Sequence, residues 1–80
     1  MYYTYVLQSE KDSNYYIGCT GNLEKRLEFH NSGLVRSTKS RIPFKLVYFE
    51  RYSSLSEARK RENKIKSYKG GNAFKKLLDN

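Results

Sequence analysis

Two short segments near the N-terminus constrain the fold most, because each has the composition of a β-strand and only a brief polar turn separates them. Residues 2–9, YYTYVLQS, are rich in aromatic and β-branched side chains, and YYIGCT at 15–20 repeats that character after the turn EKDSN. Strands joined by so short a connection pair antiparallel. The sequence therefore predicts an N-terminal β-hairpin.

The remaining chain carries helix signals on both sides of one more alternating segment. Asn22 is placed to cap a helix that stops near Gly33, and Ser54 with Glu57 forms a capping-box pattern for a second helix. That second helix ends before Gly70, and Asn72 is a candidate cap for a short third helix. We predict an α+β fold, a small three-stranded antiparallel sheet flanked by helices in the order ββαβαα. The predicted elements are strands over 2–9, 15–20 and 44–52, and helices over 23–30, 54–69 and 73–78.

The size and charge of the chain limit its organisation and its partners. Eighty residues are expected to form a single domain, 1–80, with a small core. A net charge of +8 favours polyanions such as DNA or RNA. No long apolar helix is present, so we predict no membrane partner, and no signal segment opens the chain, so we expect a cytoplasmic location. Because the chain has one Cys and one His, a structural metal site built from His and Cys ligands is excluded.

One carboxylate occupies an unexpected position in the stretch LSEARKRENKIK. A helix drawn through it repeats its inward positions at Leu55, Ala58, Glu62 and Ile65. Between Arg59 and Lys76 there are eight Lys and Arg residues, and this glutamate is the only acid among them. Two interpretations stay open at this point: a solvated salt bridge to Arg59 or Lys66, or a ligand for a hard cation such as Mg²⁺.

Four further polar side chains converge in the predicted arrangement. Tyr5 and Tyr16 lie on the paired strands, whereas Arg26 and His30 lie one turn apart on one helix face. Phenols or an imidazole can take a proton from water, and a guanidinium fits two phosphate oxygens. Each has an ordinary alternative: a core tyrosine, a surface arginine, a histidine favoured by the helix dipole. Cys19 is expected to be a small core residue.

The order and spacing of these segments carry a family resemblance. The stretches YTYVLQS with NYYIGCT, NLEKRLEFHNSG and RIPFKLVYFERYSSLSEARKRENKIK together resemble the GIY-YIG nuclease superfamily. More narrowly they resemble its small single-domain members of the UPF0213 type, which are similar to the N-terminal domain of the incision subunit of the excinuclease ABC complex. The second signature is literal, Tyr16-Ile17-Gly18, whereas Tyr3-Thr4-Tyr5 keeps only the tyrosine of the first.

The resemblance implies a function and assigns roles to the residues. It implies a metal-dependent endonuclease that hydrolyses phosphodiester bonds in DNA, in repair or recombination. Tyr5, Tyr16, Arg26 and His30 would be catalytic, and Glu62 would bind a single Mg²⁺ or Mn²⁺ ion. One tyrosine or the histidine would help to deprotonate the attacking water, and the sequence does not choose between them.

The expected partner is nucleic acid, and two other functions remain as alternatives to the nuclease. DNA is favoured over RNA, and a protein partner would supply target specificity. The predicted contacts to nucleic acid are Lys25, Arg36, Lys39, Arg41, Lys64 and Asn72, the last with a helix cap as the equal alternative. The main rival is a non-catalytic nucleic-acid-binding module on the same scaffold, and a third hypothesis is an adaptor for an acidic protein. A binding module has no need of Glu62, which favours the enzyme.

Overall fold

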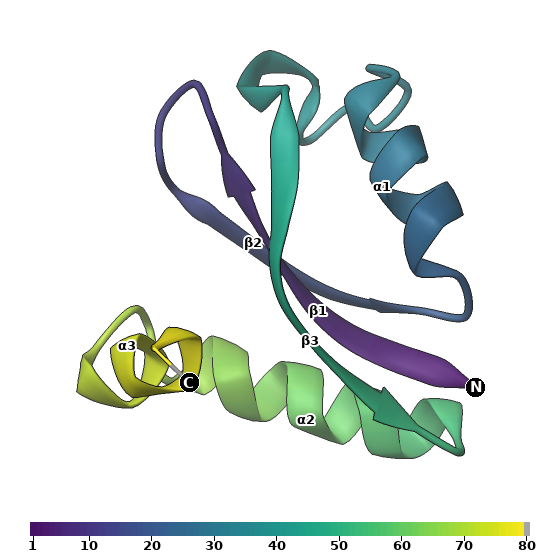
Figure 1. Ribbon diagram of the computed structural model, residues 1–80, viewed down its shortest axis with the longest axis vertical. Coiled ribbons are helices and arrows are strands. Elements are labelled where there is room, and N and C mark those ends of the chain that lie inside the picture. The colour runs from purple at the N-terminus through teal and green to yellow at the C-terminus, as the bar shows by residue number, and fades with distance from the viewer. Residues whose placement is uncertain (80) are drawn as a thin grey trace.

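The computed structural model describes residues 1–79, and Asn80 lies outside the described residues. It confirms the α+β fold, with a three-stranded antiparallel sheet and the order ββαβαα (Figure 1). A single 3₁₀ turn was not predicted. The elements are β1 (Tyr2–Ser9), β2 (Tyr15–Thr20), α1 (Leu23–Asn31), the 3₁₀ turn η1 (Lys39–Arg41), β3 (Phe44–Tyr52), α2 (Leu55–Ser67) and α3 (Asn72–Leu78).

The N-terminal strand lies in the middle of the sheet, whose order is β2-β1-β3. Thr4, Tyr5, Val6 and Leu7 are all buried, as expected for a strand covered on both faces. Pairing with β2 is regular, whereas the pairing with β3 is irregular between Val6 and Leu7. The sheet therefore leaves β2 and β3 as its two edges, and the candidate site lies at the β2 edge.

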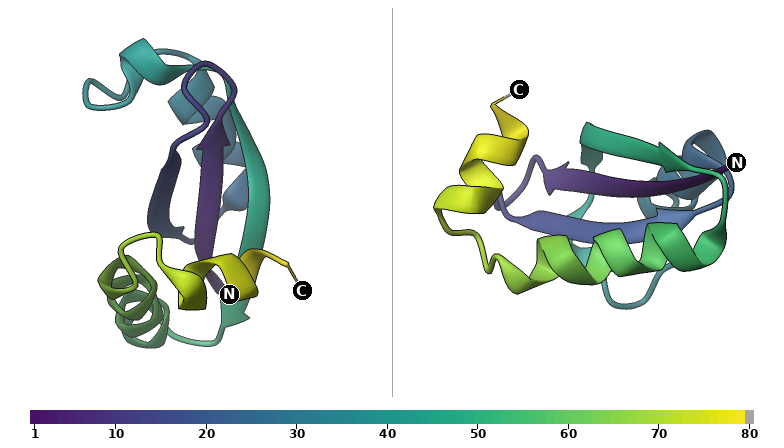
Figure 2. Two further views of the ribbon diagram at one scale, coloured as in Figure 1. Left: turned by 90° about the vertical axis from the view of Figure 1, so that its left-hand side faces the viewer. Right: turned by 90° about the horizontal axis from the view of Figure 1, so that it is seen from below.

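Two hydrophobic clusters hold helices on opposite faces of the sheet. Tyr5, Leu7 and Phe44 form the cluster beneath α1, whereas Val6, Ile65 and Phe74 form the cluster beneath α2 and α3. Figures 1 and 2 show the sheet between α1 on one side and α2 on the other, with α3 turned back beside the end of α2. Alternate residues of β1 therefore point toward different helices.

The helix caps agree with the sequence at two of three sites. The side chain of Asn22 accepts a hydrogen bond from the Lys25 amide at 3.0 Å, and Ser54 accepts one from the Glu57 amide at 3.3 Å. The alternative of Asn72 as a cap is wrong: Gly71 occupies that position without a side-chain bond, and Asn72 is the first helical residue. No helix in residues 1–79 is long and apolar enough to cross a bilayer.

One predicted inward position is also wrong. Leu55 is 38% exposed, whereas Ala58 and Ile65 are fully buried. Leu55 is the first residue of α2, and only two residues separate it from the end of β3. The first turn of the helix therefore lies at the margin of the sheet, where less of the core is available to cover it.

Candidate functional site

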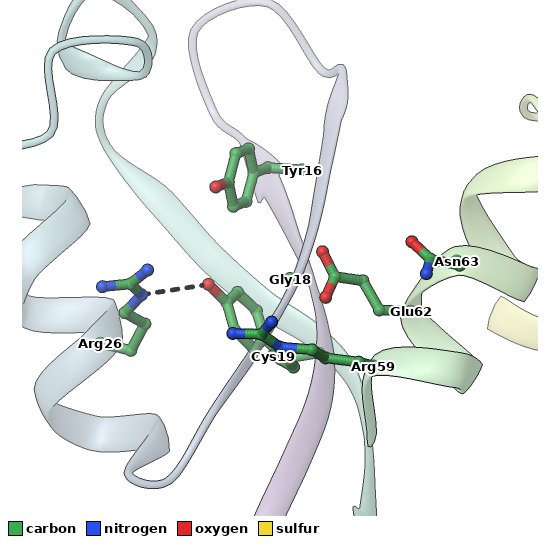
Figure 3. Close-up of a pocket in the computed structure, with 8 residues that line it drawn as sticks. Tyr16, Gly18, Cys19, Arg26, Arg59, Glu62 and Asn63 are labelled. Atoms are coloured by element: carbon green, nitrogen blue, oxygen red, sulfur yellow. Dashed lines mark hydrogen bonds between the residues drawn. The ribbon is translucent and has the colours of Figure 1, made fainter. Parts of the chain in front are cut away.

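A cavity of about 380 Å³ opens beside the edge strand β2, and residues from four elements line it (Figure 3). The strands β1 and β2 form its floor, and α1 and α2 form its walls. Most of the lining side chains are polar or charged. They are Tyr5, Tyr16, Gly18, Cys19, Arg26, Arg59, Glu62 and Asn63.

The cavity joins the two faces of the sheet because one residue of β2 has no side chain. Gly18 is the register partner of Tyr5, and a Cβ atom at Gly18 would lie 2.6 Å from the Tyr5 hydroxyl and 2.8 Å from Cζ. Contacts that short do not occur between real Cβ atoms and their neighbours. Glycine is therefore required for the Tyr5 phenol to lie across the edge strand, where it faces the α2 side chains.

The Tyr5 hydroxyl is the centre of the polar contacts on the α1 side. Arg26 Nε donates to it at 3.4 Å, and His30 Nε2 lies 3.3 Å away. Burial raises the pKa of Tyr5, and the hydrogen bond from Arg26 opposes that rise in part. As predicted, Tyr5, Tyr16 and Arg26 line one cavity.

His30 lies behind the cavity rather than on its wall. Its ring is fully buried and packs against the rings of Tyr5, Tyr16 and Phe44. Nδ1 lies 3.1 Å from the Thr38 hydroxyl, so both ring nitrogens have protein partners. Burial lowers the pKa of His30, and Arg26 adds to that effect, which keeps the ring neutral. His30 therefore reaches the cavity only through Tyr5.

Glu62 faces the cavity and also forms an ion pair. Its carboxylate lies 2.7 Å from Lys66 Nζ, one of the two partners expected from the sequence, and its side chain is 17% exposed. Cys19 lines the same cavity, and burial first and Glu62 second raise the pKa of its thiol. Figure 3 shows Glu62 directed toward β2, with Arg59 beside it. The salt bridge to Lys66 is thus present, and the role of Glu62 as a metal ligand stays a prediction.

The donor set fits a hydrated hard cation. Within residues 1–79 no group of three His, Cys, Asp or Glu side chains gathers as a metal cage. Mg²⁺, however, is commonly held by one or two carboxylates while waters and phosphate oxygens fill its other positions. A single carboxylate on an open polar cavity is compatible with that pattern, and Glu62 is the carboxylate that lines this cavity.

The predicted nucleic-acid contacts divide into exposed and engaged side chains. Lys25 is exposed next to Arg26 on α1, and Arg36 and Lys39 are exposed in the segment that follows α1. Arg41 instead donates to Asp12 Oδ2 at 3.1 Å and to the Tyr15 carbonyl at 3.3 Å. Its guanidinium thus braces the β1–β2 turn, a structural duty that the sequence did not indicate.

Two other predicted contacts lie away from the cavity. Lys64 is two residues beyond Glu62 on α2, which places it about 200° further around the helix axis. Asn72 is exposed at the start of α3 and is not among the residues that line the cavity. Neither side chain is positioned beside the catalytic candidates, although both remain exposed to solvent.

Sequence reasoning missed three side chains on the cavity wall. Arg59 was treated only as a salt-bridge partner, Cys19 was expected in the core, and Asn63 was not considered. Arg59 lies three residues before Glu62 and Asn63 follows it directly, so helical spacing alone could have found both. Nothing in the local sequence shows that Cys19 on an edge strand meets α2.

Comparison with known proteins places the chain in a family. The sequence model of the GIY-YIG catalytic domain matches residues 1–75. The chain is 48% identical over 67 residues to the UPF0213 protein CPE1444 of Clostridium perfringens, covering 82% of this chain and 71% of that protein. It is 50% identical over 66 residues to a UPF0213 protein of Syntrophus aciditrophicus, covering 80% and 75% respectively.

A solved structure agrees with the sequence matches. The solution NMR structure of the UPF0213 protein BH0048 from Bacillus halodurans superimposes with a TM-score of 0.55 and 31% identity, covering 98% of this chain and 82% of that one. The chain therefore belongs to the GIY-YIG nuclease superfamily, within its UPF0213 group. Membership implies nucleic-acid binding, and GIY-YIG nucleases generally depend on a divalent metal ion.

Proposed function

We propose that this protein is a divalent-metal-dependent endonuclease that hydrolyses phosphodiester bonds in DNA. One observation carries the proposal: a carboxylate, two guanidinium groups and two phenols line the same open cavity. They are Glu62, Arg26, Arg59, Tyr5 and Tyr16. A carboxylate among phosphate-binding cations suits a metal site, and it would only weaken a surface built to hold nucleic acid.

Glu62 is the proposed ligand for Mg²⁺ or Mn²⁺. When bound, the ion supplies a Lewis acid that polarises the phosphate and stabilises the leaving oxygen. Lys66, at 2.7 Å, neutralises the carboxylate when no ion is present. Because the Lys66 side chain is 52% exposed, it can swing into solvent at little cost when the carboxylate is used.

The two arginines are the proposed phosphate contacts. Arg26 reaches the cavity from α1 and Arg59 from α2, so they approach a phosphate between them from opposite walls. A guanidinium group binds phosphate oxygens in a fork of two parallel hydrogen bonds. They would stabilise the negative charge that develops as water attacks.

Tyr5 and Tyr16 are the proposed contacts for the attacking water. The hydroxyl of Tyr5 already binds Arg26 and His30, so its orientation is set before substrate arrives. Its raised pKa keeps it a neutral phenol at pH 7. Tyr5 can therefore accept a proton from water only as it passes its own proton on, and His30 is the partner in contact with it.

The exposed basic residues extend the proposed DNA surface beyond the cavity. Lys25, next to Arg26, and Arg36 and Lys39, after α1, are placed to contact the DNA backbone. DNA rather than RNA, a role in repair or recombination, and a protein partner for target choice belong to this proposal. So does action in the cytoplasm.

One observation favours a second candidate function. The ion pair of Glu62 with Lys66 leaves the site without an uncompensated negative charge, which suits a module that binds nucleic acid and does not cut it. The two functions differ in what Glu62 contributes. In the module there is no cleavage to lose, and removing Glu62 keeps or tightens DNA binding.

Cleavage of end-labelled DNA separates the two functions. Purified protein is incubated with duplex, nicked, branched and single-stranded DNA in Mg²⁺, Mn²⁺ or EDTA. We expect metal-dependent cutting that falls by at least about 1000-fold in Glu62→Ala, while DNA binding in EDTA is kept or tightened. Glu28→Ala, which removes an exposed acid from α1, is the charge-matched control and should cut normally.

Three outcomes contradict the proposal in different ways. Binding of every substrate without cutting would establish the non-catalytic module. Equal loss of binding and cutting in Glu62→Ala would show a structural role for the glutamate. Negligible DNA affinity even at low salt would support an adaptor for an acidic protein instead.

A further inference from the structure

A chain of hydrogen-bonding groups runs from the cavity into the protein behind Tyr5. The Tyr5 hydroxyl meets His30 Nε2 at 3.3 Å, Nδ1 meets the Thr38 hydroxyl at 3.1 Å, and that hydroxyl lies 3.4 Å from the Val35 carbonyl oxygen. Tyr5, His30 and Thr38 are each no more than 1% exposed. The His30 ring and the Thr38 hydroxyl lie behind Tyr5 and away from the cavity, so protein groups decide where their protons lie.

The final acceptor in this chain sets the direction of every bond. A carbonyl oxygen cannot donate, so the Thr38 hydroxyl donates to Val35 and offers its oxygen lone pairs to His30. Nδ1 of a neutral His30 then carries the proton, and Nε2 accepts from Tyr5. In the opposite tautomer Nδ1 carries no proton and must accept a hydrogen bond from the Thr38 hydroxyl. No hydrogen then remains for the contact between that hydroxyl and the Val35 carbonyl oxygen. Only the first arrangement satisfies all three contacts together.

We propose that Thr38 is a positioning residue: it holds His30 as the Nδ1–H tautomer, so that Nε2 can accept the proton of Tyr5. This inference rests on the proposed function, because it names the route by which water loses its proton. Neither Thr38 nor His30 touches substrate. Both act through the Tyr5 hydroxyl, which lies at the inner wall of the cavity.

The proton transfer balances without any further reactant. An O–H bond of the attacking water breaks as a new O–H bond forms on Tyr5, and the earlier Tyr5 O–H bond breaks as N–H forms on His30 Nε2. The ring becomes an imidazolium that donates from Nδ1 to Thr38 and from Nε2 to Tyr5. The hydroxide adds to phosphorus as the bond between phosphorus and the leaving oxygen breaks. The leaving oxygen takes a proton from solvent, and the imidazolium returns its Nε2 proton through Tyr5 to solvent, which restores the neutral ring.

The groups around His30 are compatible with an acceptor role. The phenol rings of Tyr5 and Tyr16 pack against the His30 ring, and Arg26, which donates to the Tyr5 hydroxyl, adds a positive charge nearby. Burial and Arg26 keep the ring unprotonated before the reaction. A ring held neutral is free to receive a proton, whereas a ring already charged could not.

The tautomer is measurable without any assay of cleavage. His30 is the only histidine in the chain, so a two-bond ¹H–¹⁵N correlation spectrum of ¹⁵N-labelled protein at pH 7.5 contains one imidazole. We expect Nδ1 at the shift of a protonated nitrogen and Nε2 at the shift of an unprotonated one. A protonated Nε2 would overturn the inference whatever the protein does to DNA.

Two variants of Thr38 test the connection to the reaction. Thr38→Val keeps the shape and removes the hydroxyl, and Thr38→Ser keeps the hydroxyl. In Thr38→Val we expect a mixture of tautomers and a fall in kcat of roughly 10- to 100-fold, with DNA affinity unchanged. Thr38→Ser should restore both the tautomer and most of the rate.

The outcomes distinguish this inference from the proposed function. If the wild type does not cut DNA, the proposed function fails while the spectrum still reads the tautomer. If the wild type cuts and Thr38→Val cuts equally well, the positioning role is wrong. If Thr38→Val does not fold, the wild-type spectrum and Thr38→Ser decide: an Nε2–H tautomer in the wild type, or a loss of rate in Thr38→Ser despite a native tautomer, contradicts the inference.

Discussion

The same kinds of side chain meet in two places on this small protein, with opposite results. The cavity combines Glu62, two arginines and two tyrosines. Elsewhere, Glu50 on β3 accepts hydrogen bonds from Arg61 on α2, from Nε at 2.8 Å and from Nη2 at 3.1 Å. The hydroxyls of Tyr48 and Tyr52 donate to the same carboxylate. We call these four residues, Glu50, Arg61, Tyr48 and Tyr52, the closed cluster.

The difference between the cavity and the closed cluster lies in how far each carboxylate is satisfied. Each carboxylate oxygen of Glu50 accepts two hydrogen bonds, so no acceptor capacity remains for a ligand. Burial alone would raise the pKa of Glu50, but Arg61 and the two phenols lower it below its usual value. Glu62 has one lysine partner, which is half exposed, and its carboxylate can be approached through the cavity. A functional site is therefore recognised by unused bonding capacity, not by the residue types present.

Gly18→Ala should produce the largest effect and should act on the cavity alone. The new methyl group would collide with the hydroxyl end of Tyr5, which is pinned by Arg26 and His30. A displacement of about 1 Å at a reacting group costs roughly 100-fold in rate, and we expect cleavage to fall by that factor. Single-turnover cleavage measures it. Gly21→Ala is the matched control, because its Cβ would meet only Tyr2 at 3.7 Å, and it should cut normally.

Glu50→Gln should lower the stability of the fold and leave cleavage intact. Glu62→Gln should lower cleavage and leave stability nearly unchanged. Removing the charge leaves the Arg61 guanidinium, whose side chain is 28% exposed, without its ion pair. We expect a loss of about 2 kcal/mol in the free energy of unfolding, below the values for fully buried pairs because solvent reaches this one. For Glu62→Gln we expect a change under about 0.5 kcal/mol. Urea denaturation of both variants measures the difference; equal destabilisation would remove the distinction between the two regions.

The closed cluster should also produce the smallest of the three effects, a dependence of stability on alkaline pH. Burial and the Glu50 carboxylate raise the pKa of Tyr52 to about 12. Because the folded protein holds this proton more tightly than the unfolded chain, the contribution is complete below pH 10 and is lost as the pH rises through about 12. Tyr52→Phe should flatten the fall in stability between these values. Tyr2→Phe, which alters an exposed phenol, should not, and denaturation at several pH values compares them.

The elements were predictable because their signals are local. The caps at Asn22 and Ser54 and the alternation along the strands need no knowledge of the rest of the chain. The convergence of Tyr5, Tyr16, Arg26 and Glu62 followed from strand and helix periodicity together with the family resemblance. What sequence could not supply was that the cavity passes around an edge strand, so that residues from both faces of the sheet share it.

The missed residues show where that reasoning stopped. Cys19 was assigned to the core as a small residue in a strand, but β2 is an edge strand and Cys19 lines the cavity together with residues of α2. Asn72 was considered because it lies late in the domain, whereas Asn63, which is on the cavity wall, was not considered. Glu50 was not considered as a ligand from the sequence. In the structure, the contacts made by Arg61, Tyr48 and Tyr52 occupy its carboxylate.

The arrangement of the cavity around Gly18 couples ligand binding to folding. Its walls come from residues 5–63, so no fragment of the chain that lacks either end of this range contains the whole site. A ligand that binds there stabilises the complete fold by RT ln(1 + [L]/Kd), about 2.7 kcal/mol at a concentration about 100 times Kd. In a protein of 9.5 kDa that is a large share of the usual total. The melting temperature of the intact chain is therefore a sensitive reporter of which ions and nucleic acids it prefers.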